Sequence, residues 1–270
     1  MNEETTCRRG CCLTIAGSDS GGNAGVQADL RAFHAYGLHG CTVLAALTAQ
    51  NPREVSAIHE VPPEFVAAQL DAVLGVYDIR ALKTGMLADA AAIEAVADRI
   101  AAHPEIARVV DPVMIATSGA RLLRADASRA LAERLLPLAT LATPNLPEAA
   151  ELCGAGGDAA TLARGVYERY GCATLVKGGH AGGRDSVDVL YDGRGLRTFS
   201  LPRIARPAST HGTGCTLAAA LAAELALGRG LAEAVEGAKR HVHAAIAGAY
   251  LVGDGCGVLG FVRSGLGGTT

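Results

Sequence analysis

The chain has 270 residues, of which 50% are hydrophobic and 19% are charged, and this composition excludes a disordered or collagen-like protein. Its formal net charge is −3 and it contains no tryptophan, so neither nucleic acid nor an anionic membrane is favoured as a partner. A chain of this length can bury one substantial core, and we expect it to act on a small molecule.

The N-terminal segment does not have the pattern of a targeting signal. Glu3, Glu4, Arg8 and Arg9 precede a short apolar run that ends at Ala16, which is the wrong charge order for a secretory signal. No apolar run approaches the roughly 20 residues that a membrane-spanning helix requires. We therefore expect a cytoplasmic protein.

Short apolar runs alternate with longer alanine-rich stretches, a pattern typical of a parallel sheet covered by helices on both faces. The expected central strands are Leu13–Ala16, Thr42–Thr48, Ala81–Thr84, Arg108–Val113, Leu141–Thr143 and Thr174–Lys177. The expected helices are about Gly25–Tyr36, Pro63–Tyr77, Asp89–Ala102, Asp126–Leu136, Ala159–Tyr170, Cys215–Leu227 and Leu231–Leu251.

Two further segments depart from simple alternation. Val55–Val61 is expected to form an additional strand, and Val187–Ser200 a hairpin that turns at Asp192-Gly193. No repeat and no long linker divides the chain. We predict an α/β fold with a mostly parallel central sheet, in one domain over residues 1–270 with tails at 1–11 and 254–270.

The first glycine-rich loop, Ala16–Gly25, follows a predicted strand and opens a helix. Backbone N–H groups at such a place can approach an anionic ligand, but a plain tight turn explains the glycines equally well. The loop is neither a G-x-G-x-x-G fingerprint nor a P-loop. Asp29, one turn into the helix, could reach back to a ligand, and the residues alone favour a solvated acid.

Polar residues follow or end several predicted strands, at the edge of a parallel sheet where ligands bind. Gln50 offers a carboxamide that suits an aminopyrimidine edge, or it is simply a strand end that faces water. Asp111 and Lys177 close two other strands. Asn145 and Glu148 suit magnesium held through nucleotide phosphates, and the same residues would also suit an N-cap and a first-turn acid.

The segment Thr210–Thr216 (THGTGCT) enters a helix at about Gly214 and is the most informative in the chain. Its glycines let backbone N–H groups converge, and the helix dipole adds positive potential that suits a phosphoryl group in transfer. Cys215 would lie at the helix N-terminus, where the pKa of a thiol tends to fall. The other cysteines form no C-x-x-C pair and are expected to be small buried hydrophobes.

In this order the segments resemble the hydroxymethylpyrimidine/phosphomethylpyrimidine kinase family of the ribokinase-like superfamily. The resemblance spans about residues 13–250 and is carried by Ala16–Leu30, Leu47–Asn51, Lys83–Leu87, Asp111–Met114, Thr143–Ala149, Lys177–His180 and Thr210–Ala218. Most ribokinase-like enzymes have Asp where this chain has Cys215. That cysteine and the Thr-Ala-Gln-Asn segment select the family.

The resemblance implies a three-layer α/β/α sandwich, usually a homodimer, that uses ATP and Mg²⁺ in thiamine biosynthesis. It implies phosphorylation of 4-amino-5-hydroxymethyl-2-methylpyrimidine and then of its monophosphate to the diphosphate. The implied substrate pocket contains Gln50, Asp29, Gly17, Ala24, Met86 and Val113. The implied nucleotide contacts are Asn145, Lys177, Thr213 and Gly214, the implied metal-site residues are Glu148, Asn145 and Asp111, and the implied catalytic group is Cys215 with Gly212, Thr213 and Gly214.

Three positions depart from the family pattern. Asn23 stands where the family has Gly, Thr117 where it has Lys, and Ser209 where it has Asn. Asparagine tolerates left-handed backbone geometry better than most residues, so we expect the first loop to survive. A pyridoxal or pyridoxine kinase and an ATP-binding regulator without turnover remain as alternatives. A dinucleotide-dependent oxidoreductase is disfavoured because G-x-G-x-x-G is absent.

Overall fold

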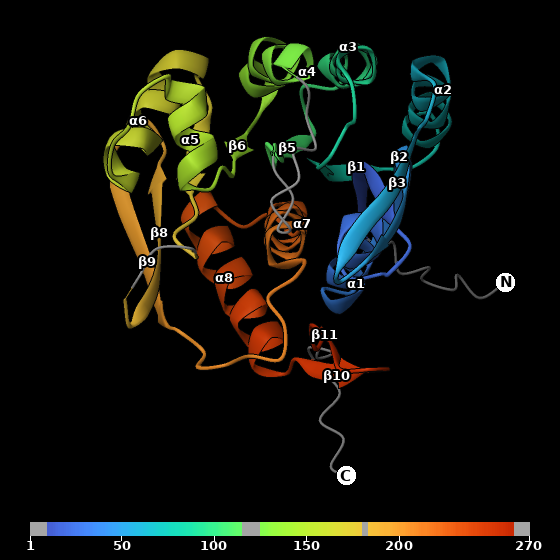
Figure 1. Ribbon diagram of the computed structural model, residues 1–270. Coiled ribbons are helices and arrows are strands. Elements are labelled where there is room, and N and C mark those ends of the chain that lie inside the picture. The colour runs from blue at the N-terminus through green and yellow to red at the C-terminus, as the bar shows by residue number, and fades with distance from the viewer. Residues whose placement is uncertain (1–9, 115–124, 180–182, 262–270) are drawn as a thin grey trace, which may run out of the picture.

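The computed structural model describes residues 10–114, 125–179 and 183–261, and a nine-stranded sheet with helices on both faces forms its centre (Figure 1). The strands lie in the order β3-β2-β1-β4-β5-β6-β7-β8-β9. Their bounds are β1 Cys11–Asp19, β2 His39–Asn51, β3 Glu54–Glu60, β4 Ile79–Thr84, β5 Ala107–Val110, β6 Leu141–Ala142, β7 Ala173–Val176, β8 Asp185–Tyr191 and β9 Leu196–Pro202. Neighbouring strands from β2 to β7 pair in parallel, whereas β3, β8 and β9 pair antiparallel at the edges.

Two groups of helices cover the two faces of this sheet (Figure 1). One face carries α1 Gly25–Ala35, α7 Thr213–Ala226 and α8 Leu231–Ala247. The other carries α2 Pro63–Leu74, α3 Ala90–Ala101, α4 Ala125–Ala130, α5 Leu146–Cys153 and α6 Ala159–Tyr170. The expected three-layer α/β/α architecture is therefore confirmed.

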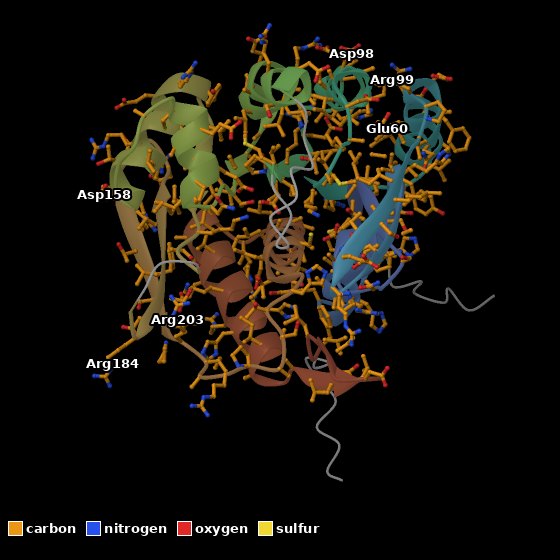
Figure 2. All side chains as sticks on the ribbon, viewed as in Figure 1. Glu60, Asp98, Arg99, Asp158, Arg184 and Arg203 are labelled. Carbon is orange, nitrogen blue, oxygen red and sulfur yellow. The ribbon has the colours of Figure 1, made fainter. Side chains whose placement is uncertain are left out.

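Strand β1 shows why the central strands are apolar over their whole length. Leu13 and Ile15 pack in the core beneath α2 to α6, while Cys12 packs in the core beneath α7 and α8. Alternate side chains of a strand point to opposite faces, so a strand covered on both faces needs apolar residues at successive positions. Charged side chains such as Asp98, Asp158 and Arg184 lie at the periphery instead (Figure 2).

Helix α7 is the central helix of its layer, and its many alanines allow it to pack closely against its neighbours. Every residue from Thr216 to Ala223 is buried. Small side chains let the helix pack closely against β1, β4, β5 and the neighbouring α1 and α8. The backbone at the start of α7 is thereby held in one place relative to the sheet.

The C-terminal region differs from the sequence-based expectation. Helix α8 ends at Ala247, and Leu251 lies in β10 Tyr250–Val252, which pairs antiparallel with β11 Cys256–Val258. Gly253 and Gly255 have φ of 54° and 82°, so they allow the turn between these strands. The predicted tail at 254–270 is therefore wrong over 254–261, where Leu259 is buried, and the predicted tail at 1–11 is wrong at Cys11, where β1 begins.

Helix α4 continues through a π-helical turn, Leu131–Leu135, and a 3-10 turn, Leu136–Leu138. Pro137 explains this ending, because proline removes a backbone donor from a regular helix. Among the described residues, no helix combines the length and apolar character needed to cross a membrane. The departure at Thr117 and the residue His180 lie outside the described residues.

Candidate functional site

A cavity of about 650 Å³ opens where the parallel strands end and α5 and α7 begin. Most of the predicted site residues line it, and these are Gly17, Ala24, Gln50, Met86, Asp111, Val113, Asn145, Glu148, Lys177, Gly212, Thr213, Gly214 and Cys215. A β-carbon at Gly17 would lie 2.9 Å from Met86 Cε, so glycine there leaves this part of the cavity open. The sequence therefore predicted a set of residues that the fold does bring together.

Asp29 is the exception, because it lies beneath the cavity lining; the solvated acid that the residues alone favoured is wrong, and the role in substrate binding stays a prediction. Its side chain is fully buried, and its Oδ2 accepts hydrogen bonds from Lys83 Nζ at 2.8 Å and Thr14 Oγ1 at 2.6 Å. Lys83 is also fully buried, yet it lines the cavity. Burial alone would lower the pKa of Lys83, but Asp29, with smaller contributions from Cys215 and Asp111, raises it overall. The two residues form a buried ion pair beneath the site.

The first loop is organised by Asp19 at the end of β1. Its carboxylate accepts hydrogen bonds from the backbone N–H groups of Gly21, Asn23 and Ala24 at 2.8 to 2.9 Å. Burial alone would raise the pKa of Asp19, but His211 and these N–H groups lower it overall. The loop therefore encloses an ionised carboxylate of its own, which sequence reasoning missed.

Asn23 does not need the left-handed geometry that we expected of it. The positive φ values in this loop belong to Gly22 at 75° and Gly25 at 58°. A β-carbon at Gly25 would also lie 2.4 Å from Gly17 O. Glycine is therefore required at position 25 both by the positive φ and by the close contact with the backbone. Asn23 is buried and fits the loop without strain at φ.

The second glycine-rich turn packs directly against the first. Gly212 has φ 85°, and a β-carbon there would lie 1.9 Å from Asn23 O. Gly212 also provides no side-chain cap for α7. The Thr213 N–H donates to Thr210 O at 3.4 Å, which leaves the Gly214 and Cys215 N–H groups for an anionic ligand at the positive end of the helix dipole.

Cys215 lies partly exposed in the first turn of α7, at the wall of the cavity. We expected the helix N-terminus to lower the pKa of its thiol, and that expectation is wrong. Burial raises the pKa of Cys215, Lys83 opposes this, and the carboxylates of Asp29 and Asp111 raise it further. The thiol is therefore protonated at neutral pH.

Lys177 and Asp111 form an ion pair beside the Gly212–Cys215 turn, where a β-carbon on Gly214 would lie 3.7 Å from Lys177 Nζ and 3.8 Å from Asp111 Oδ2. Lys177 Nζ donates to Asp111 Oδ1 at 2.8 Å, and Thr143 Oγ1 donates to the same oxygen at 3.1 Å. Burial alone would lower the pKa of Lys177, but Asp111 and Glu148 raise it overall. Lys177 is therefore a cation at the cavity wall, and the Asp111 carboxylate partly neutralises its charge.

Asn145 and Glu148 form a capping box at the start of α5. Asn145 Oδ1 accepts from the Glu148 N–H at 2.9 Å, and Glu148 Oε2 accepts from the Asn145 N–H at 2.8 Å. Burial raises the pKa of Glu148, Lys177 lowers it, and Asp111 raises it. The capping role is confirmed, whereas the role in metal binding stays a prediction. In the described parts of the chain, no three or more His, Cys, Asp or Glu side chains are grouped to hold a metal alone.

A second buried ion pair was also missed by sequence reasoning. Lys239 Nζ on α8 donates to Asp188 Oδ2 on β8 at 2.6 Å, and both residues line the cavity. Asp188 Oδ1 accepts from the Gly178 N–H at 2.8 Å, next to Lys177. The pair therefore ties the turn after β7 to helix α8. No local pattern could reveal it, because the partners are 51 residues apart.

The chain is similar to known proteins over most of its length. The family model described as phosphomethylpyrimidine kinase matches residues 19–260. The chain is 50% identical over 242 residues to the hydroxymethylpyrimidine/phosphomethylpyrimidine kinase of Rhizobium meliloti, covering 88% of this chain and 90% of that one. It is 48% identical over 261 residues to the thiamine biosynthesis bifunctional protein ThiED of Geobacter sulfurreducens, covering 95% of this chain and 53% of that one.

A solved structure shows the same fold over almost the whole chain. The ADP complex of Bacillus subtilis pyridoxal kinase superposes with a TM-score of 0.86 at 34% identity, and the match covers 93% of this chain and 97% of that one. The present chain spans about half of the length of the Geobacter sulfurreducens protein.

Proposed function

The chain belongs to the phosphomethylpyrimidine kinase family, and from this we propose that it phosphorylates 4-amino-5-hydroxymethyl-2-methylpyrimidine and then its monophosphate, with ATP as the donor. One observation carries the proposal. A single cavity brings the Gly212–Cys215 turn together with a carboxamide, Gln50, and with a cation, Lys177. The turn supplies the place of phosphoryl transfer, the carboxamide suits the ring, and the cation suits the phosphates.

The Gly212–Cys215 turn fits the transition state of phosphoryl transfer. Charge spreads over the equatorial oxygens of the transferred group, and catalysis consists mainly of positioning and charge stabilisation. Uncapped N–H groups in the first turn of α7 are fixed donors for such charge. Lys177 adds a positive charge on the nucleotide side. The protein therefore needs no strong base in this cavity.

Cys215 has a modest part in this chemistry, because its thiol is protonated. In a loose transition state the acceptor hydroxyl loses its proton late, so a thiol that touches and orients this hydroxyl is sufficient. We infer that Cys215 is the catalytic residue on the acceptor side, through contact with the hydroxyl rather than through strong basicity. The raised pKa of this thiol supports that assignment.

Magnesium fits the oxygen atoms that line the nucleotide side of the cavity. Burial and the nearby Asp111 carboxylate raise the pKa of Glu148, and a divalent cation near Glu148 would favour its ionised form. Glu148 and Asp111, with the Asn145 amide oxygen, would hold Mg²⁺ partly through phosphates and water. When bound, the cation supplies neutralisation of phosphate charge during transfer.

A second candidate activity is the phosphorylation of pyridoxal, since the Bacillus subtilis neighbour carries the name pyridoxal kinase. Pyridoxal also has a hydroxymethyl group, but it lacks the amino group that Gln50 would bind. The test measures kcat/KM for hydroxymethylpyrimidine, its monophosphate and pyridoxal with the same enzyme. We expect the two pyrimidines to be preferred, and a preference for pyridoxal would refute the proposal.

We also propose an oligomeric state and a cellular location, and we keep a third candidate function. We infer a homodimer in the cytoplasm, supported by the family resemblance alone, and sedimentation equilibrium would test it with the monomer as the contrary result. A regulator that binds ATP without turnover is the third candidate. It would be established by nucleotide binding without ATP consumption in the presence of hydroxymethylpyrimidine.

A further inference from the structure

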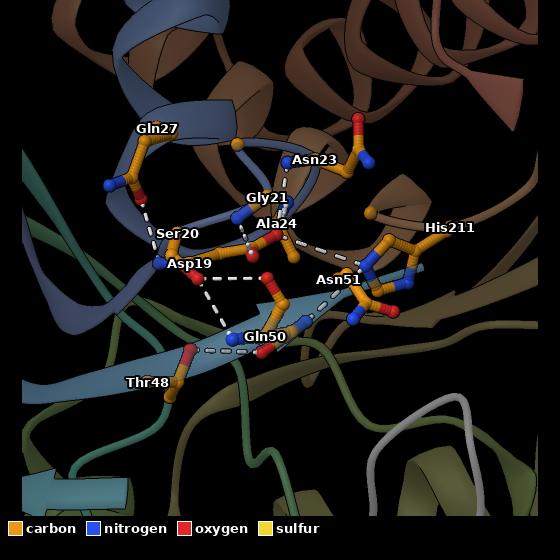
Figure 3. Close-up of polar contacts among 12 residues, drawn as sticks. Asp19, Ser20, Gly21, Asn23, Ala24, Gln27, Thr48, Gln50, Asn51 and His211 are labelled. Carbon is orange, nitrogen blue, oxygen red and sulfur yellow. Dashed lines mark hydrogen bonds and ion pairs between the residues drawn. The ribbon is translucent and has the colours of Figure 1, made fainter. Parts of the chain in front are cut away.

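Gln50 lies where the first loop, strand β2 and the segment that leads into the Gly212–Cys215 turn meet (Figure 3). The Ser20 hydroxyl lies 2.8 Å from both the backbone N and the backbone O of Gln50, so the end of β2 is fixed to the first loop. The carboxamide then lies between Thr48 and His211. Two orientations of the carboxamide keep both contacts, and they differ by the exchange of its oxygen and nitrogen.

The hydroxyl of Thr48 limits which end of the carboxamide can face it. Thr48 Oγ1 lies 3.0 Å from Ser18 O and 3.2 Å from Gln50 Oε1. A carbonyl oxygen only accepts, and the hydroxyl has a single hydrogen. When Thr48 donates to the closer Ser18 carbonyl, the carboxamide must present its nitrogen to Thr48 as the donor.

Asp19 limits which atom of the Gln50 carboxamide can face His211, and it favours the same orientation as Thr48 does. His211 Nε2 lies 3.4 Å from Gln50 Nε2 and 3.9 Å from Asp19 Oδ2 (Figure 3). The Asp19 carboxylate is ionised and only accepts, so it favours a hydrogen on His211 Nε2. With that hydrogen in place, His211 can donate to the Gln50 oxygen but not accept from its nitrogen.

One arrangement therefore gives each of these groups a partner of the right kind. Thr48 donates to Ser18 O, the Gln50 nitrogen donates to Thr48, and His211 donates to the Gln50 oxygen while it faces Asp19. In this arrangement the carboxamide is rotated by half a turn from the position drawn in Figure 3. One N–H of Gln50 and one lone pair of its oxygen remain for a ligand.

We propose that His211 is a positioning residue that holds the Gln50 oxygen toward the Gly212–Cys215 turn and so sets the orientation of the bound ring. This inference rests on the proposed function. In the pyrimidine, the hydroxymethyl carbon is attached beside the carbon that carries the amino group, and the ring nitrogen lies on the other side of that carbon. The amino group donates to the Gln50 oxygen, and the ring nitrogen accepts from the Gln50 N–H.

The direction of the carboxamide decides whether the bound substrate is productive. His211 directly precedes Gly212, so the end of Gln50 that contacts His211 is the end nearer to the catalytic turn. The amino group, and the hydroxymethyl group beside it, then lie toward Cys215. The opposite rotation would exchange donor and acceptor and turn the hydroxymethyl group away. His211 thereby acts on specificity through Gln50.

The first arm of the test is the ¹⁵N NMR spectrum of His211 in the substrate-free enzyme, assigned by comparison with His211→Gln. We expect a hydrogen on Nε2. An unprotonated Nε2, with the hydrogen on Nδ1, would overturn the proposed arrangement whatever the substrate is. This arm does not depend on turnover.

The second arm compares His211→Leu, His211→Gln and Gln50→Leu, alone and combined, with exposed His59→Leu on β3 as the control. We expect His211→Leu to lower kcat/KM for hydroxymethylpyrimidine about tenfold, with the KM for ATP unchanged and no further loss in the Gln50→Leu background. His211→Gln retains a donor and should retain most of the activity. The melting temperature of each variant identifies those that fail to fold.

Additive losses in the double variant, or equal losses in His211→Leu and His211→Gln, would overturn the inference while the proposed function stands. A wild-type enzyme that phosphorylates neither pyrimidine would refute the proposed function and, with it, the specificity role of His211. In that case the NMR arm still decides whether His211 donates toward Gln50. The two failures are thus distinguishable.

Discussion

Lys83 Nζ lies 2.8 Å from Asp29 Oδ2, and both side chains have no exposed surface. The pair joins β4 to α1, and Thr14 on β1 adds a third contact at 2.6 Å. The charges of both residues also act on the Cys215 thiol. This pair therefore links the stability of the domain centre to the electrostatic environment of the catalytic turn.

Removal of one charge from this pair should lower the stability of the fold. We expect Asp29→Asn to lower the free energy of unfolding by about 3–5 kcal/mol, because it leaves the Lys83 ammonium buried without a counter-charge. Asp29→Asn combined with Lys83→Met should cost less than the sum of the two single changes. Urea unfolding measures these values, with Glu236→Gln in the exposed Arg240–Glu236 pair as the control. An effect of Asp29→Asn no larger than that of the control would refute the role of the pair.

Cys215→Ala should lower turnover while the binding of ATP stays nearly unchanged. General-base help is typically worth ~10²–10⁴-fold, and a protonated thiol places the expected loss near the lower limit. Cys215→Asp should recover part of the rate, since a carboxylate can also contact the acceptor hydroxyl. The measurement is kcat together with nucleotide affinity by calorimetry. Wild-type turnover in Cys215→Ala would remove the thiol from the mechanism.

The pH dependence of alkylation tests the state of the same thiol. Because burial raises the pKa of Cys215, the reactive thiolate is scarce at neutral pH, and the rate should rise with pH into the range above the ordinary thiol pKa. The rate of iodoacetamide modification at this residue is followed by peptide mass spectrometry from pH 6 to 10. A rate that reaches its plateau below pH 8 would show a lowered pKa and contradict the electrostatics described above.

Glu148→Gln tests the magnesium site without breaking the capping box, because a glutamine side-chain oxygen can still accept from the Asn145 N–H. The half-saturating magnesium concentration should increase more than the KM for the pyrimidine does. Glu64→Gln, in the first turn of α2, changes a similar helix-start acid away from the cavity and is the matched control. Superimposable magnesium titrations of Glu148→Gln and wild type would leave Glu148 with its capping role only.

Gln50→Leu tests which ring the carboxamide binds. Because pyridoxal lacks the amino group, the change should reduce kcat/KM for hydroxymethylpyrimidine more than for pyridoxal. The unpaired polar edge costs ~1–3 kcal/mol, or about tenfold to a hundredfold. Gln50→Glu can accept from the amino group but cannot donate to the ring nitrogen when it is ionised, so it should also favour pyridoxal relative to wild type. Equal losses for both substrates would mean that Gln50 only supports the cavity wall.

The parts of the fold that depend on local pattern were predictable from the sequence. Apolar runs identified the central strands, and the polar residues that follow them, such as Asp111 and Lys177, met at one cavity because parallel strands end at one edge. The place of Gly212–Cys215 followed from its glycines and the helix that comes after them.

The parts that depend on distant partners were not predictable. The sequence indicated a solvated acid or a substrate-binding residue at Asp29. Its buried partner Lys83 could not be recognised, because the two residues are 54 positions apart. The pKa of Cys215 was misjudged because the helix dipole is a local effect, whereas burial and the carboxylates of Asp29 and Asp111 come from the tertiary fold. His211 stood beside the glycine turn in the sequence, but only the fold shows its position between Gln50 and Asp19.

The most direct test of the central claim is a time course of products from wild-type enzyme with ATP, Mg²⁺ and 4-amino-5-hydroxymethyl-2-methylpyrimidine. The pyrimidine monophosphate and diphosphate are separated and quantified at each time. We predict that the monophosphate accumulates first and is then converted to the diphosphate, with one ATP consumed at each step. No ATP-dependent phosphorylation of the pyrimidine, or a reaction that stops at the monophosphate while ATP remains, would contradict the account.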